Sequence, residues 1–137
     1  MIRNTDYFQT VHQIINTGHW FTDRLNTGLK DYQITEPKYN VLRILRWGKG
    51  TPITVHEIQE RMIQRSSNVT RILDKLIRKG LVNRHECPSN RRRMDVTITS
   101  MGEDLLVWLD RKVHDFHKPI SENLTKAEAE RLKKTGN

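Results

Sequence analysis

Short polar and cationic side chains gather at the start of a predicted helix near the middle of the chain. These residues are Ser66, Ser67, Asn68, Thr70, Arg71 and Lys75. Arginine can donate two hydrogen bonds to a guanine edge, asparagine can pair with adenine, and lysine neutralises phosphates. The residue types therefore favour contact with the major groove of DNA. Arg71 and Asn68 could each hold a phosphate instead, and the sequence does not choose between these roles.

A second cationic cluster follows the helix, between two predicted strands at residues 81–86 and 93–99. The intervening segment CPSNRR predicts a turn, and the cluster consists of Arg91, Arg92 and Arg93. A narrow minor groove concentrates negative potential and attracts arginine. We expect Arg91 and Arg92 to enter such a groove, whereas Arg93 is expected to flank the phosphates.

The charge of the whole chain is concentrated around these two clusters. The 137 residues carry a formal net charge of +8. Residues 61–93 contain ten arginines and lysines against Asp74 and Glu86, so this segment alone has a net charge of +8. Such an excess favours a polyanionic partner, although charge alone does not identify it.

The element carrying the first cluster is predicted from apolar spacing. Helical spacing, which buries one stripe of side chains, is seen for Val69, Ile72, Leu73, Leu76 and Ile77. Ser66 is the expected N-terminal cap and Gly80 the expected end. A short helix precedes it, opened by Thr54 and Glu57 at capping-box spacing and ending near residues 61–63. Two such helices joined by a tight turn are typical of a helix-turn-helix, and the hairpin behind them of a wing.

Three further helices are predicted outside this unit. The first spans about residues 6–30 and has a longer apolar stripe than a lone small domain easily covers, so it is expected to pack partly in its own core and partly against a second chain. Another, capped by Thr35 with Pro37 in its first turn, ends at Gly48. Ser100 and Glu103 are expected to open a helix that Pro119 breaks, and a short helix closes the chain at residues 125–134.

Other function classes lack support in the sequence. No glycine-rich phosphate loop, nucleophile with a base, or paired apolar carboxylates are found, so we expect neither an enzyme nor a cofactor. One cysteine, Cys87, excludes an intramolecular disulfide and fits a reducing cytoplasm. We expect no signal peptide and no membrane-spanning segment.

Three segments resemble MarR-type winged helix-turn-helix transcription regulators, and the likeness extends over essentially the full chain. They are ITEPKYNVLRIL, SSNVTRILDKLIRKGLVNR and NRRRMDVTITSMGEDLL. The third is the most specific, because the wing of this family usually has the order Asp-Arg-Arg, followed by a strand ending in Leu-Thr. Here the corresponding residues are Asn90-Arg91-Arg92 and Ile98-Thr99, so an amide that can still accept a hydrogen bond replaces the usual acid.

The resemblance implies a mainly α fold with a small β-hairpin wing, in one domain spanning residues 1–137. Residues 6–32 and 100–137 would form dimerisation helices, and residues 35–99 the DNA-binding lobe. The homodimer would place its two recognition helices in the major groove of a pseudo-palindromic operator in double-stranded DNA. We expect a repressor. A non-specific architectural or RNA-binding protein, and an interaction domain that no longer reads DNA, are the alternatives.

The resemblance also implies a pocket for a small aromatic effector between the dimerisation helices and the winged lobe. The expected lining residues are His12, His19, Trp20, Tyr39 and Trp47. Two other functions, metal binding and redox sensing, are not favoured by the sequence. His114 and His117 have a spacing that could share a metal, but surface histidines explain them, and no metal is predicted. Cys87 has basic neighbours but is expected to be a passive wing residue rather than a redox sensor.

Overall fold

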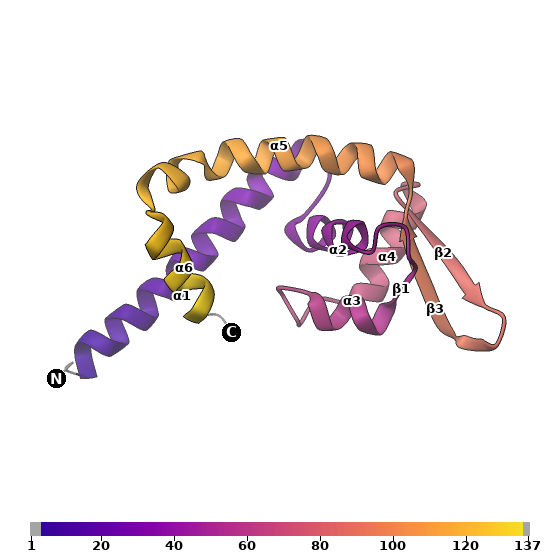
Figure 1. The fold of residues 1–137 in the computed structure, drawn as a ribbon, viewed down its shortest axis with the longest axis horizontal. Coiled ribbons are helices and arrows are strands. Elements are labelled where there is room, and N and C mark those ends of the chain that lie inside the picture. The colour runs from indigo at the N-terminus through magenta and orange to yellow at the C-terminus, as the bar shows by residue number, and fades with distance from the viewer. Residues whose placement is uncertain (1–3, 136–137) are drawn as a thin grey trace.

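A computed structural model describes residues 4–135, with the side chains at positions 4, 5, 91 and 135 left aside. The elements are α1 (Asn4–Leu29), a 3₁₀ turn η1 (Lys30–Tyr32), α2 (Glu36–Trp47), β1 (Ile53–Thr54), α3 (Val55–Arg61), α4 (Val69–Arg78), β2 (Val82–Cys87), β3 (Asn90–Ile98), α5 (Ser100–Asn123) and α6 (Lys126–Thr135). Figure 1 shows α1 and α6 at one end of α5, and the lobe of α2, α3, α4 and the hairpin at its other end. The expected winged helix-turn-helix fold, mainly α with a β-hairpin wing, is confirmed.

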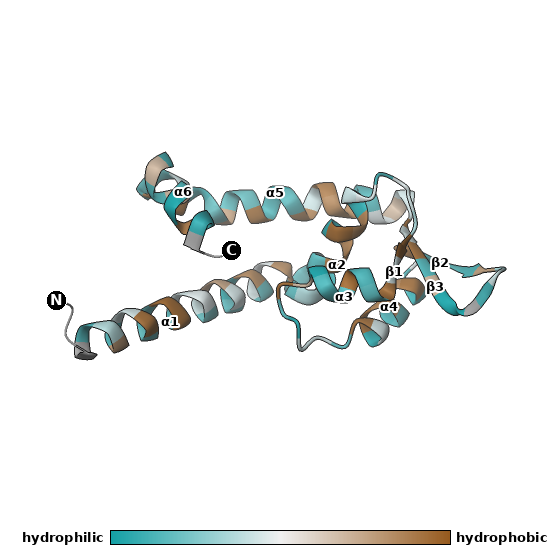
Figure 2. Ribbon diagram, turned by 60° about the horizontal axis from the view of Figure 1, so that its bottom comes forward, coloured by the Kyte–Doolittle hydropathy of each residue, from teal (hydrophilic) through white to brown (hydrophobic). Residues whose placement is uncertain are grey.

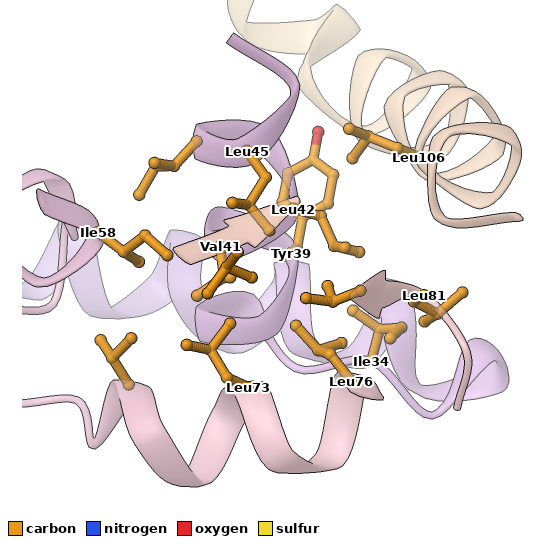
Figure 3. Close-up of a cluster of buried hydrophobic side chains, with 14 of the residues drawn as sticks. Ile34, Tyr39, Val41, Leu42, Leu45, Ile58, Leu73, Leu76, Leu81 and Leu106 are labelled. Atoms are coloured by element: carbon orange, nitrogen blue, oxygen red, sulfur yellow. The ribbon is translucent and has the colours of Figure 1, made fainter. Parts of the chain in front are cut away.

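The hydrophobic core is centred on α2. Its buried side chains point in several directions, with Val41, Leu42 and Leu45 fully enclosed (Figure 3). Leu73 and Leu76 of α4 pack against it, as the apolar stripe predicted. Tyr39 extends toward α5, where its hydroxyl donates a 2.5 Å hydrogen bond to Oδ1 of Asp110. Arg46 also pairs with Asp110, so α2 is attached to α5 by a polar contact as well as by apolar packing.

The wing belongs to a three-stranded sheet rather than to a two-stranded hairpin alone. The strand order is β1-β3-β2, and β1 pairs antiparallel with β3 through Ile53 and Val96. The prediction missed β1 because two residues show no periodicity. The prediction was also wrong about the start of the second strand, since β3 begins at Asn90 and the turn shortens to Pro88 and Ser89.

Two predicted helix starts were wrong by one or two residues. Asn68, not Ser66, caps α4, because its side chain accepts a hydrogen bond from the Arg71 amide at 3.1 Å. Thr99, not Ser100, caps α5 by accepting from the Gly102 amide at 3.0 Å. In each case a neighbouring residue with the same capping chemistry occupies the extended backbone conformation that a cap requires.

The break expected at Pro119 was wrong, whereas Thr35 occupies its expected position at the start of α2. Pro119 lies inside α5, which continues to Asn123. Proline fits helical φ, and the carbonyl four residues earlier belongs to the exposed Asp115, where water can replace the lost donor. Thr35 occupies the cap position of α2 without a side-chain hydrogen bond. The Oδ1 of Asn26 instead accepts from the Glu36 amide at 2.6 Å.

The N-terminal half of α1 carries large apolar side chains that are exposed. Phe8 is 68% exposed and Ile14 is 65% exposed, while Leu29 at the other end is buried. Figure 2 shows hydrophobic segments along this helix, which extends away from the winged lobe. Among residues 4–135, no helix combines the length and apolar character needed to cross a membrane.

Candidate nucleic-acid interface

Helix α4 is fixed at both ends by local hydrogen bonds. Asn68 caps its start, and Gly80 ends it with a φ of +74°, a conformation that glycine adopts without steric cost. The Leu81 amide donates to the Leu76 carbonyl at 3.0 Å, and the Gly80 amide donates to the Ile77 carbonyl at 2.9 Å. This pair of bonds is the Schellman motif. These bonds define where the helix begins and ends.

The turn between α3 and α4 is held by amide side chains from neighbouring helices. Gln59 of α3 donates to the carbonyls of Arg65 and Ser67 at 2.8 and 3.1 Å. The Oδ1 of Asn40 accepts from the Ile63 amide at 2.9 Å. The Nε2 of Gln64 donates to Oε2 of Glu36 at 2.8 Å. The turn is thus attached to α2, so a displacement of α2 would be transmitted to the start of α4.

The structure places the predicted recognition residues on one accessible side of α4 and its preceding turn. Exposed residues are Ser66, Asn68, Thr70, Arg71 and Lys75, while Ser67 is half-buried. Among the described residues, no acceptor binds the Arg71 guanidinium, whose donors therefore remain available for a base or phosphate. Asn68 differs, because its Oδ1 already accepts from the helix backbone. Pairing with adenine would require that same oxygen to accept a second bond.

A basic hollow of about 390 Å³ lies between the start of α2 and α4, and its lining includes Lys38, Asn68, Arg71 and Lys75. The pKa of Lys38 is lowered, first by partial burial and then by the neighbouring charges of Lys79 and Lys75. Three lysines are therefore close enough to repel one another. Lys38 was not among the predicted residues, since it is remote in sequence from the basic segment and only folding brings it to α4.

Replacement of Lys38 with alanine is expected to weaken binding to all DNA sequences to a similar degree. A phosphate contact supplies affinity without base information, and losing one should flatten the slope of log affinity against log salt by about 0.9. DNA titrations at several salt concentrations measure this slope. Lys118→Ala, at an exposed position of α5, is the matched control. An unchanged slope for Lys38→Ala would contradict a phosphate contact.

The wing, formed by β2 and β3, is attached to α4 and projects away from the helices of the lobe (Figure 1). Arg84 of β2 pairs with Asp74 of α4 at 3.0 Å. Arg92 is exposed, and its backbone amide donates to the Oδ1 of Asn90 at 3.1 Å. The Asn90 side chain thus stabilises the end of the hairpin. Arg93 pairs with Asp95 at 3.0 Å. Arg91 lies on β3, but its side chain is outside the described residues.

Cys87 lies half-buried at the end of β2. Its Sγ is 3.2 Å from the Ser89 hydroxyl, and this hydrogen bond is the largest of the effects that lower the thiol pKa. Within residues 4–135, no group of three or more histidine, cysteine, aspartate or glutamate side chains is arranged to hold a metal ion.

The five residues predicted to line an effector pocket are not brought together. Tyr39 is buried in the core, His12 and His19 are exposed on α1, and Trp20 and Trp47 are 51% and 64% exposed. The family resemblance had implied a pocket lined by these residues, but the two tryptophans lie beside arginines at the surface.

A cavity of about 790 Å³ does lie between α1, α2, α5 and α6, with none of those five residues in its lining. Its lining comprises Phe21, Thr22, Leu25, Glu36, Ile63, His117, Ile120, Ser121, Leu124, Thr125, Lys126 and Ala129. Glu36 is 6% exposed, and burial raises the pKa of its carboxyl. A buried acid in a largely apolar lining was not evident from the sequence, because Glu36 there looks like an ordinary first-turn helix acid.

Glu36→Gln is expected to raise the unfolding temperature at pH 7. Since the folded-state pKa of Glu36 is raised, the native chain binds more protons than the unfolded chain just above the ordinary pKa of 4.5, and stability falls as pH rises through that window. Glutamine removes the charge but keeps an oxygen for the Gln64 donor. Thermal unfolding of both proteins from pH 4 to pH 8 measures the effect. The difference in unfolding temperature should disappear near pH 4. A variant that is less stable than wild type at pH 7 would contradict the prediction.

The arrangement of α4, its preceding turn and the wing defines a class of protein. A capped α4 with an exposed cationic face follows a fixed turn, and a sheet-based wing follows α4, so residues 34–98 form a winged helix-turn-helix unit. The model of the MarR family matches residues 34–94. This match covers the winged helix-turn-helix unit of the chain, and the MarR family consists of transcription regulators.

Individual relatives agree with this assignment. The chain is 29% identical over 99 residues to the HTH-type transcriptional regulator PapX of Escherichia coli, and 25% identical over 112 residues to the HTH-type transcriptional repressor IacR of Pseudomonas putida. These matches cover 72% and 82% of the chain but only 60% and 66% of the two relatives. A mutant of Escherichia coli MarR, solved with operator DNA, superposes with a TM-score of 0.77 at 25% identity, covering 98% of this chain and 96% of that one.

Proposed function

We propose that this chain is a sequence-specific repressor that binds a pseudo-palindromic operator as a homodimer and is released by a small effector. Residues 6–32 and 100–137 would build the dimer, and residues 35–99 the DNA-binding lobe. The solved MarR relative with operator DNA and the relative named a repressor support this assignment.

One observation carries the proposal. The guanidinium of Arg71, on the exposed face of a capped α4, has no acceptor among the residues that the structure describes, and Lys38 and Lys75 lie beside it in the same hollow. This arrangement combines one group able to read a base with two able to hold the backbone. Ser66, Ser67, Thr70 and the wing residues Arg91, Arg92 and Arg93 would add contacts around it.

Binding to the DNA upstream of its own gene, compared with a scrambled sequence at two salt concentrations, tests the proposal. If the protein recognises an operator, it should bind the native sequence more tightly than the scrambled one. This preference should persist when a higher salt concentration weakens both complexes. Equal affinity at each salt concentration would instead support the non-specific architectural alternative.

Dimerisation is expected to depend on the exposed apolar half of α1. Ile14→Glu should raise the dimer dissociation constant at least about 30-fold, because it would bury an unpaired charge at an interface centre. Sedimentation equilibrium measures the change, and Asn16→Glu, which adds the same charge at an already polar exposed position, is the control. A folded wild-type chain that stays monomeric at micromolar concentration would contradict the homodimer.

The effector site we propose is the 790 Å³ cavity, whose volume falls in the range of small-molecule pockets. Its walls come from both the dimerisation helices and α2 of the winged lobe. A ligand there would bind more tightly to one arrangement of these two parts than to the other. That difference in affinity is what a ligand needs in order to shift the spacing between two recognition helices.

A further inference from the structure

We propose that Glu36 selects a cationic effector, one with an apolar body and a protonated nitrogen, and that this ligand acts on DNA binding by competing with Gln64 for the carboxylate. The inference rests on the proposed effector function. It adds the chemical class of the ligand and the first contact that the ligand changes.

The lining of the cavity determines the body of the ligand. Phe21 and Leu25 come from α1, Ile120 from α5, and Leu124 from the segment joining α5 to α6. These side chains offer apolar surface and no strong polar partner. An aryl or alkyl group therefore fits this space, and it would gain free energy by leaving water.

Glu36 determines the charge of the ligand. It is 6% exposed, whereas the other ionisable lining residues, His117 and Lys126, are exposed. Gln64 donates to its Oε2. The second oxygen, Oε1, has no hydrogen-bond partner among the described residues and is not fully enclosed, and Glu36 lines the cavity, so a ligand there could reach it. A protonated amine would supply both the missing donor and the opposite charge, while a carboxylate ligand would meet repulsion there.

The same carboxylate connects the cavity to the helix-turn-helix. Gln64 lies in the turn between α3 and α4, and its neighbour Ile63 both lines the cavity and donates its amide to Asn40 of α2. An ammonium group bound at Oε1 would draw the carboxylate and its charge toward the cavity, so it would compete with the Gln64 amide for this group and weaken the bond to Oε2. Because the turn is held by only a few such bonds, losing this one would free the segment that positions the start of α4.

Three probes with one carbon skeleton test the charge preference: 4-phenylbutylamine, 4-phenylbutan-1-ol and 4-phenylbutanoate. Calorimetric titration of the wild-type dimer should show the amine binding about tenfold more tightly than the alcohol, as one charge-assisted hydrogen bond provides, and the acid binding most weakly. Glu36→Gln should abolish the preference for the amine but keep the affinity for the alcohol, which also shows that the variant is folded. Glu122→Gln, at an exposed position of α5, should behave as wild type.

The coupling has its own test. Gln64→Ala should still bind the amine, but the amine should no longer lower the affinity of this variant for DNA as it does in the wild type. If Gln64 only stabilised the fold, its replacement would not abolish the effect of the amine on DNA affinity while leaving amine binding intact. Continued release of DNA from Gln64→Ala by the amine would overturn the coupling.

Other outcomes overturn the charge selection. The proposal is wrong if the acid binds most tightly, or if Glu36→Gln still prefers the amine. It is also wrong if no probe binds, as when a helix of a second copy fills the cavity. DNA affinity of the ligand-free protein is measured separately. If that protein selects its own upstream DNA and ignores the amine, the inference fails while the proposed DNA function stands. If it lacks DNA selectivity, the proposed function fails even where the amine binds.

Discussion

Gly102→Ala is expected to destabilise the folded chain by about 3 kcal/mol and to lower its unfolding temperature by on the order of 10 °C. A Cβ at this position would lie 2.3 Å from the Leu81 carbonyl oxygen and 2.8 Å from Cγ1 of Ile98. The first of these atoms belongs to the backbone, which cannot rotate away. The overlap can be relieved only if α5 moves away from the segment that follows α4.

That segment is where three elements meet. Thr99 caps α5, its hydroxyl donates to the Gly80 carbonyl at 2.7 Å, and its amide donates to the Leu81 carbonyl at 3.0 Å. A shift of α5 at Gly102 would therefore disturb the end of α4 and the base of β3 together. We expect the DNA affinity of any folded fraction to fall as well.

Gly18→Ala is the matched control, because no heavy atom of a neighbouring element lies within 4 Å of its added Cβ. Alanine is favoured over glycine inside a helix by about 1 kcal/mol, so this variant should be as stable as wild type or more so. Thermal and urea unfolding of both variants measure the contrast. A Gly102→Ala protein as stable as wild type would contradict the close approach of α5 to Leu81.

Arg71→Ala is expected to remove most of the discrimination at one base pair in each half-site, a loss of about 1–3 kcal/mol in preference for the native operator over its mutated form. The guanidinium has no acceptor among the described residues of its own chain, and it stands on the exposed side of the first turn of α4. The N-terminal part of a recognition helix contacts base edges in the major groove.

Lys75→Ala provides the comparison, since Lys75 lines the same hollow one turn further along α4. It should weaken native and mutated operators alike and reduce the salt dependence of both. Competition binding against a set of operators with single base changes separates the two behaviours. Undiminished base preference in Arg71→Ala would show that this arginine holds a phosphate and that another residue reads the sequence.

Periodicity and capping chemistry predicted much of the fold. The apolar stripe from Val69 to Ile77 predicted α4, and a glycine with positive φ ended it at Gly80 as expected. Thr54 accepts from the Glu57 amide at 3.1 Å, as the capping box predicted. Such features depend on residues within one turn of each other, so sequence spacing is sufficient to predict them.

Where several residues share one chemistry, local sequence was not sufficient. Asn68 follows two serines and Ser100 follows Thr99, and each of these side chains can cap a helix. The choice depends on where packing starts the helical backbone. Strand β1 is another case, because two residues become a strand only through pairing with β3.

The basic segment at residues 61–93, the amphipathic α4 and the cationic residues that a DNA-binding surface requires could be predicted from the sequence, because charge and helical spacing are properties of neighbouring residues. Only the tertiary structure brought Lys38 to α4 and moved the candidate effector site from the predicted aromatic residues to the cavity beside Glu36. Both results depend on contacts between segments far apart in the chain. Glu36 is buried and bonded to Gln64, 28 residues away, because α2 packs against the turn before α4. No local sequence pattern predicts this contact.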